Sequence, residues 1–174
     1  MGFVIAAVAL VGALCVLDLL LTVAVLRRLR EHETVLERLR PEADVDALVG
    51  ARVPDFTLTT VEGRTLTAAG LRGRRWLLAL LSVGCGPCRE QAPALRDAGD
   101  DVVAIVTGEG APANGLVEDL RGAVAVVTVQ AGSGPGAALG VSVYPTLLAV
   151  DEDGVVSAAA HNVAGLGRPS AGRV

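Results

Sequence analysis

A buried-strand pattern that runs directly into two cysteines constrains the fold more than any other feature of this 174-residue chain. Residues 76–83 (WLLALLSV) form an apolar run that is short enough for a strand covered on both faces. The motif Cys85-Gly86-Pro87-Cys88 follows at once, and residues 85–98 are expected to form a helix that Pro93 kinks. A buried strand that passes into a helix in this way is typical of an α/β domain.

Further apolar segments extend this pattern into a central sheet. Residues 56–60 and 64–67 flank Glu62-Gly63, a turn signal that predicts a hairpin. The other segments are expected to form strands at 102–107, 124–129, 144–150 and 155–160, a short helix at 112–121 and a helical turn at 137–139. Helices between the first strands and a tight turn between the last two predict a mixed sheet, parallel first and antiparallel at its end.

The N-terminal end of the chain is a separate and far more apolar segment. Residues 3–26 contain one charged side chain, Asp18, and as a helix they would be about 36 Å long, enough to cross a hydrocarbon core of ~30 Å. No basic residue precedes the stretch and no cleavage site follows it before Arg27, which argues against a removable signal peptide. We therefore expect residues 1–26 to be a retained transmembrane anchor, with Asp18 protonated or bonded to Thr22.

The segments around the α/β pattern complete the expected domain organisation. Residues 27–52 are interpreted as a helical and acidic linker, residues 53–160 as the globular domain, and residues 161–174 as a disordered tail that contains Gly and Pro. Three arginines follow the anchor closely and no basic residue precedes it. The positive-inside rule would therefore place the globular domain in the cytoplasm.

Composition excludes several classes of function. Aromatic residues make up 2% of the chain and the net charge is −4, which argues against nucleic-acid partners. All 15 basic residues are arginine, so neither Schiff-base chemistry on lysine nor a Walker lysine is available. Three cysteines are too few for a disulfide scaffold, and one of them, Cys15, lies in the apolar N-terminal stretch.

The Cys85-Gly86-Pro87-Cys88 motif carries the expected chemistry. A helix N-terminus presents free N–H groups and a partial positive charge, both of which stabilise a thiolate. Cys85 is expected to attack a substrate disulfide and Cys88 to resolve the mixed disulfide, so the redox-active Cys85–Cys88 pair needs no cofactor. Zinc would need two further ligands that His32 and His161 do not convincingly supply, and a structural disulfide across two residues would constrain the unfolded chain little.

A second feature is the segment Tyr144-Pro145-Thr146, which opens an expected strand. Taken alone, its proline is most simply an edge-strand proline. Together with the cysteine pair it gains a second interpretation, a rigid cis turn that leaves the adjoining backbone unpaired. The backbone of Tyr144 is then free to hydrogen-bond an extended substrate.

With these features in combination, the sequence resembles the thioredoxin superfamily. Residues 147–156 then correspond to the closing hairpin of the thioredoxin fold. Residues 53–58 (VPDFTL), followed by Leu71-Arg72-Gly73, resemble the entry of the membrane-anchored TlpA-like branch, and its MauD-like members in particular. The resemblance covers roughly residues 53–160. It implies a three-layer thioredoxin-like fold and disulfide exchange with protein partners on the extracytoplasmic side, opposite to the side that the arginines indicate.

The chain departs from the family pattern at several positions. Gly84 stands where thioredoxins usually have Trp, Ala79 where thioredoxin has a buried Asp, and Gln91 where many TlpA-like members have Glu. The acid that helps to deprotonate the second thiol is thus missing, while Glu90 and Glu109 are expected to be solvated surface charges.

The tail is a further departure from the family pattern. Its Gly and Pro content is expected to prevent the last helix of the fold. One face of the sheet would then need cover from residues 27–40, from the membrane surface or from a partner, and the charge of residues 27–40 favours a partner or the membrane.

Two alternative functions stay open at this stage. The entry segment is shared with peroxiredoxins, and Ser82 matches the hydroxyl residue of a peroxidatic site, but Leu78 replaces its proline. The other alternative is a non-catalytic assembly factor that binds partners along the cis-proline edge.

Overall fold

The computed structural model describes residues 1–2, 4–5, 10, 12, 45–110 and 115–167. The chain divides into two compact units, Met1–Ala43 and Asp44–Val174. Among the described residues, no helix has the length and apolar character needed to span a bilayer. Most of the expected anchor (residues 1–26), and the expected linker as far as residue 44, lie outside the described residues.

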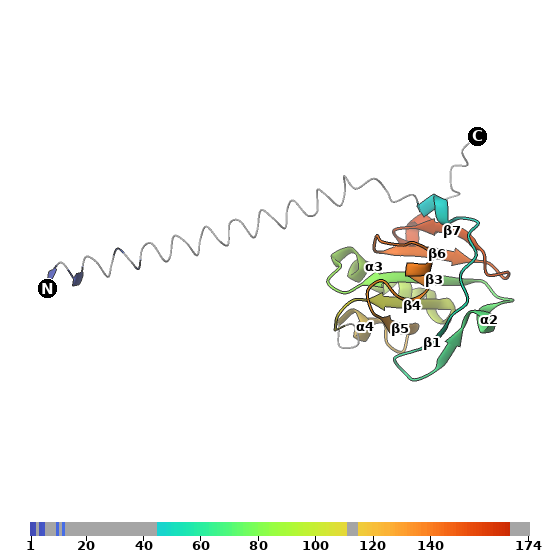
Figure 1. The fold of residues 1–174 in the computed structure, drawn as a ribbon, viewed down its shortest axis with the longest axis horizontal. Helices are drawn as coiled ribbons and strands as arrows, with labels where there is room; N and C mark the ends of the chain where they lie inside the picture. The colour runs from blue at the N-terminus through green and yellow to red at the C-terminus, as the bar shows by residue number, and fades with distance from the viewer. Residues whose placement is uncertain (3, 6–9, 11, 13–44, 111–114, 168–174) are drawn as a thin grey trace. The chain divides into compact units, whose positions relative to one another are not determined.

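The second unit is built on a five-stranded mixed sheet (Figure 1). Its strands are β3 (Trp76–Ser82), β4 (Val102–Thr107), β5 (Ala125–Val129), β6 (Thr146–Val150) and β7 (Val156–Ala160), in the order β5-β4-β3-β6-β7. The pairs β3–β4 and β4–β5 are parallel, whereas β3–β6 and β6–β7 are antiparallel. The predicted order, parallel first and antiparallel at the end, is confirmed.

Strand register explains how distant parts of the sequence meet. The helix α3 (Gly86–Ala98) and the 3₁₀ turn η2 (Gly99–Asp101) cross over from β3 to the parallel strand β4. Because β6 runs antiparallel to β3, with Thr146 opposite Leu80, the start of β6 lies beside the end of β3. The segment just before β6 is thereby brought to the place where α3 begins.

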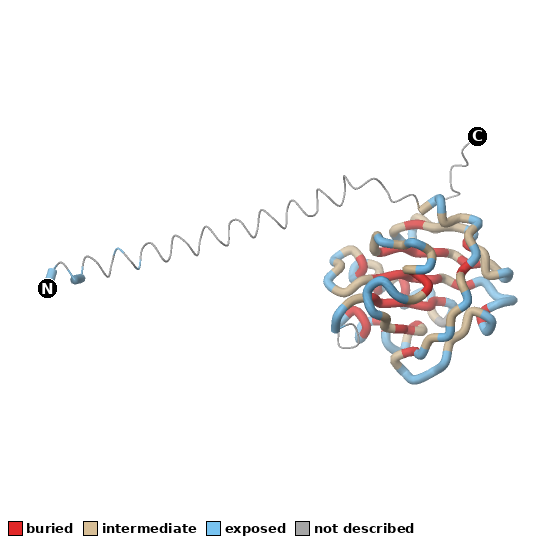
Figure 2. Tube along the Cα trace, in the orientation of Figure 1, coloured by how far each residue is buried: buried red, intermediate tan, exposed pale blue. Residues whose placement is uncertain are grey.

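Alternating side chains of the sheet fill two apolar clusters, one on each face. Ala79 and Leu81 of β3 join α3 and α4 (Gly115–Leu120) on one face. Leu78 and Leu80 point to the other face. These four β3 side chains are at most 1% exposed, and Figure 2 shows buried residues concentrated in the central strands. Burial of each leucine contributes about 1.5–3 kcal/mol, so β3 is the centre of the core.

The second face is covered by several short elements from two separate parts of the sequence, residues 45–71 and 134–138. They are η1 (Val45–Leu48), the antiparallel hairpin β1 (Thr57–Thr59) and β2 (Thr65–Thr67), α2 (Ala68–Leu71) and α5 (Gly134–Ala138). The helix α5 begins three residues before the predicted turn at 137–139. Pro135 is compatible with this earlier start, because it lies in the first turn of the helix, where a missing N–H has no cost. The helix expected at 112–121 is described only from residue 115 onward, because residues 111–114 are not described. In that part α4 agrees with the prediction to within one residue.

The chain after β7 differs from the expectation of a disordered tail. Residues Val163–Gly167 form a 3₁₀ helix, η4, and Val163 and Leu166 pack against the cluster on the α3 face. Asn162 closes this turn, because its Oδ1 accepts a hydrogen bond of 2.7 Å from Gly165 N. This part of the expected disordered tail, residues 163–167, is therefore a 3₁₀ helix, and residues 168–174 lie outside the described residues. A single 3₁₀ turn can partly cover two apolar side chains without helical periodicity, so the Gly content did not prevent local structure here.

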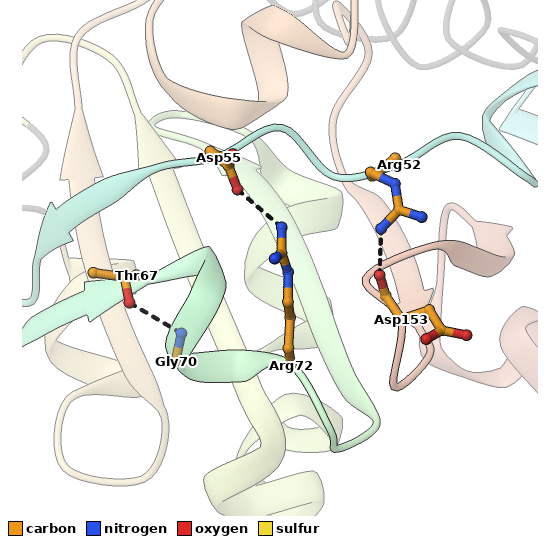
Figure 3. A network of polar contacts seen from close by, with 6 residues as sticks. All are labelled: Arg52, Asp55, Thr67, Gly70, Arg72 and Asp153. Carbon is orange, nitrogen blue, oxygen red and sulfur yellow. Dashed lines mark hydrogen bonds and ion pairs between the residues drawn. The ribbon is translucent and has the colours of Figure 1, made fainter.

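Polar contacts gather at the end of β3 where the strand begins, because Arg52, Arg72 and Asp153 lie around its first residue, Trp76. Figure 3 shows these contacts. Arg72 pairs with Asp55 at 3.3 Å, and Arg52 donates to the backbone carbonyl of Asp153. Thr67 caps α2 by accepting a 3.0 Å hydrogen bond from Gly70 N. These bonds fasten the entry segment and the β6–β7 turn to the domain, far along the sheet from the cysteines.

Candidate redox site

The two cysteines follow the buried central strand. Between β3 and α3 the chain turns at Gly84, whose φ of +74° is a left-handed conformation that favours glycine. Cys85 N donates to Ser82 O at 3.4 Å, which closes this turn. The glycine that stands where thioredoxins usually have Trp is therefore required by the backbone, and a tryptophan here would be strained.

Cys85 is the N-cap residue of α3. Its Sγ accepts a 3.2 Å hydrogen bond from Cys88 N, and Pro87 lies in the first turn of the helix. In the reduced protein this N–H and the positive end of the helix dipole would both face a thiolate on Cys85. The local sequence thus forms the thiolate-stabilising geometry that the motif predicts.

The structure is the oxidised form, with a disulfide between Cys85 and Cys88 and a Cα–Cα distance of 5.3 Å. The two sulfurs have different access to solvent. Cys85 is half-buried, whereas Cys88 is 0% exposed and belongs to the core cluster beneath α3. An external thiol or thiolate can therefore reach Cys85 and not Cys88.

The segment before β6 lies against the cysteine pair. The Tyr144–Pro145 peptide bond is cis, and Tyr144 O is 3.7 Å from Cys85 Sγ. A disulfide sulfur has no proton to donate, so this is a contact in the oxidised protein and a potential S–H···O bond only in the reduced one. Pro145 and Thr146 are buried, and the Thr146 hydroxyl donates to Val143 O at 2.8 Å.

Two further side chains join the site to the chain after β7, and sequence reasoning gave neither of them this role. Gln91, in α3, accepts a 3.0 Å hydrogen bond from Val163 N through its Oε1. His161 Nδ1 lies 2.7 Å from Pro145 O. The only sequence signals were a glutamine at a family Glu position and a histidine just after the last strand, and neither signal specifies a partner.

The remaining predicted positions lie as follows. Ala79 is fully buried beneath α3, at the place of the missing acid, while Glu90 and Glu109 are exposed, in keeping with surface charges. Within the described part of the chain, no three His, Cys, Asp or Glu side chains form a group that could hold a metal ion.

A cavity of about 630 Å³ opens at the carboxyl ends of β4 and β5. Its described lining is residues 108–110 and 128–131. Residues 108–110 follow β4, Thr128 and Val129 end β5, and residues 130–131 follow it. Neither the cysteine motif nor the cis proline is part of this described lining.

The fold and the site together define a thioredoxin-like thiol–disulfide oxidoreductase, in which a cysteine pair begins the helix after the central strand and a cis proline lies beside it. The chain belongs to the Redoxin family, whose sequence model matches residues 48–172. No curated protein gives a significant match to the sequence.

Solved structures of similar fold come from several bacteria. A candidate thiol:disulfide interchange protein DsbE from Chlorobium tepidum has a TM-score of 0.56 at 23% identity, covering 66% of this chain and 84% of that one. A secreted Mycobacterium tuberculosis disulfide oxidoreductase homologous to DsbE has a TM-score of 0.52 at 23% identity, covering 68% and 87%. The pneumococcal exposed lipoprotein thioredoxin Etrx1 of Streptococcus pneumoniae has a TM-score of 0.52 at 23% identity, covering 62% and 88%. At these identities the likeness establishes the fold.

Proposed function

We propose that this chain is a membrane-tethered oxidoreductase that exchanges disulfides with protein partners through Cys85 and Cys88 on the extracytoplasmic side. The observation that carries the proposal is the asymmetry of the cysteine pair. Cys85 caps a helix, is partly accessible and touches the backbone of Tyr144, whereas Cys88 is fully buried directly behind it.

The asymmetry assigns a role to each sulfur. In the reduced protein, the Cys85 thiolate attacks one sulfur of a substrate disulfide, forms a mixed disulfide and releases one substrate thiolate. The Cys88 thiolate then attacks Cys85 Sγ, forms the Cys85–Cys88 disulfide and releases the second substrate thiolate. Two electrons pass from the protein to the substrate, and the reverse sequence oxidises a substrate dithiol.

The backbone beside the sulfurs supports a polypeptide as the partner. Tyr144 O lies next to Cys85, just outside strand β6. An extended chain that pairs with the backbone there would bring its own disulfide to Cys85 by addition of a strand-like segment. Side chains of the partner need not be recognised for this pairing.

The apolar stretch at residues 3–26 supports a membrane tether. Disulfide chemistry is typical of compartments outside the cytoplasm, and two proteins of similar fold are described as secreted and as an exposed lipoprotein. The arginines after the stretch favour the opposite orientation, so topology needs its own measurement. A C-terminal alkaline phosphatase fusion should be active and a C-terminal green fluorescent protein fusion dark, while the opposite pair of results would refute the extracytoplasmic assignment.

Insulin-disulfide reduction by the full chain in detergent, with dithiothreitol as the electron source, tests the exchange activity. The chain should accelerate insulin reduction over dithiothreitol alone, and Cys15→Ser, which removes a cysteine outside the motif, should leave the rate unchanged. A chain that consumes hydrogen peroxide efficiently and does not accelerate insulin reduction would be a peroxidase. A chain that does neither would be the non-catalytic assembly factor.

A further inference from the structure

The backbone carbonyl of Pro145 is held by a side chain where the sheet ends. The last paired residues of β6 and β7 at this end are Leu147 and Ala160. Beyond them the chain at Pro145 is buried, and its carbonyl meets His161 Nδ1 at 2.7 Å, at the short end of the range for N–H···O hydrogen bonds. His161 therefore continues, with its side chain, the bonding that the two strands make with their backbones.

The chemistry of the two groups fixes the direction of this bond. A carbonyl oxygen can only accept, so His161 must carry its proton on Nδ1. A buried carbonyl left without a donor would be destabilising, so the structure needs a partner for it here. The bond thus defines one tautomer of the neutral ring, with the lone pair on Nε2.

The position of Pro145 O affects the redox site because Pro145 O and Tyr144 O belong to consecutive peptide units, joined through the same proline residue. Tyr144 O lies 3.7 Å from Cys85 Sγ, and the Tyr144–Pro145 peptide unit has no N–H of its own that could fix it. A second hydrogen bond holds the segment that carries His161, because Val163 N, two residues further along, donates to Gln91 Oε1. The chain after β7 is thereby fastened both to α3 and to the cis-proline segment.

We propose that His161 is a positioning residue for substrate binding. Its Nδ1–H holds the Pro145 carbonyl and so keeps the Tyr144 backbone in place beside Cys85 for pairing with the extended chain of a protein substrate. The inference rests on the proposed function, because it concerns the binding of a polypeptide and not the chemistry of the sulfurs.

The test compares three variants of the full chain in detergent. His161→Leu removes the donor, and His161→Asn keeps an N–H donor close to the position of Nδ1. Ser157→Ala is the matched control, because the Ser157 hydroxyl makes the same kind of bond from β7 to a β6 carbonyl, Ala149 O, at 3.1 Å and away from the cysteines. The probes are insulin, a protein disulfide, and glutathione disulfide, a small one.

Loss of one hydrogen bond that orders the binding segment should raise the KM for insulin about tenfold in His161→Leu, with kcat within about twofold of wild type. The rate with glutathione disulfide should stay within about twofold of wild type in every variant, and His161→Asn and Ser157→Ala should keep the wild-type KM. An unchanged KM in His161→Leu would overturn the inference, as would an equal loss with both probes or a failure of His161→Asn to restore the KM.

A measurement on the unmodified chain keeps the inference testable if His161→Leu does not fold. Nitrogen-15 NMR of the histidine ring should show the Nδ1–H tautomer for His161, and a dominant Nε2–H tautomer would overturn the inference. The two proposals fail in different ways. Wild-type chain that exchanges with glutathione disulfide but not with insulin would refute the proposed function, and the inference with it, whereas wild-type activity on insulin that is indifferent to His161→Leu refutes the inference alone.

Discussion

The two ends of strand β3 are held by different kinds of polar contact. At its first residue, exposed charged side chains make contacts: Arg72 and Asp55 are 3.3 Å apart with side chains 54% and 86% exposed, and Arg52 donates to the backbone carbonyl of Asp153. At its last residue, the contacts join uncharged groups that are partly buried, such as Gln91 Oε1 with Val163 N and Thr146 Oγ1 with Val143 O. Both ends rest on the same buried strand.

The two kinds of contact suit the two ends of β3 to different roles. Exposed ion pairs lie in high dielectric, are screened by salt and contribute about 0–1 kcal/mol each, so the first end is only fastened. Partly buried neutral bonds fix geometry without adding a fixed charge, so a thiolate formed at Cys85 meets the positive end of α3 rather than a neighbouring carboxylate. The following predictions test this contrast.

The largest effects are expected at the cysteines. Cys85→Ser should abolish insulin reduction, because the accessible nucleophile is lost, whereas Cys88→Ser should accumulate mixed disulfides that nothing resolves. Non-reducing gels and mass spectrometry of the trapped species would identify the attached residue as Cys85. Normal turnover by Cys88→Ser, or trapping by Cys85→Ser, would reverse the assigned roles.

Core leucines at the two ends should be equally costly to remove. Leu71 is 1% exposed beside the ion pairs, and Leu147 is 0% exposed beside the cis proline. Truncation of either to alanine should lower the free energy of unfolding by about 2–5 kcal/mol, read from urea denaturation. Leu71 and Leu147 belong to the clusters on opposite faces, and a loss below ~1 kcal/mol at either one would show that its end of the sheet does not depend on its own cluster.

Much of this arrangement was predictable from local sequence patterns. The apolar run at 76–83 and the turn at Asp151–Gly154 predict a buried strand and a closing hairpin, and antiparallel pairing then brings Pro145 to the cysteines. The roles of Gln91 and His161 were not predictable. Both depend on the path of the chain after β7, where the five-residue 3₁₀ helix η4 leaves no periodic signal in the sequence.

Gln91→Ala should have an intermediate effect. It leaves Val163 N without its partner, which should lower the free energy of unfolding by about 1 kcal/mol. Gln91→Glu keeps an acceptor oxygen and should restore most of this loss near neutral pH. Glu90→Gln, at the exposed neighbouring position, is the matched control, and an equal midpoint for Gln91→Ala and the control would show that the bond does not stabilise the protein.

The smallest effect is expected at the ion pair. Arg72→Ala should change the free energy of unfolding by no more than about 0.5 kcal/mol, and 1 M salt should remove most of that difference. Leu71→Ala at the next position provides the contrast. A salt-independent loss above ~2 kcal/mol would show that Arg72 acts through packing or a buried contact, and would remove the distinction between the two ends.

The central claim is that Cys85 and Cys88 form one reversible two-electron couple. Its most direct test is a redox titration of the full chain in glutathione buffers, with acid quenching, alkylation of free thiols and mass spectrometry of the peptides. We expect a single two-electron transition in which Cys85 and Cys88 gain and lose their labels together while Cys15 is labelled independently. A disulfide that involves Cys15, separate transitions for the two motif cysteines, or a pair that cannot be reduced and reoxidised would contradict it.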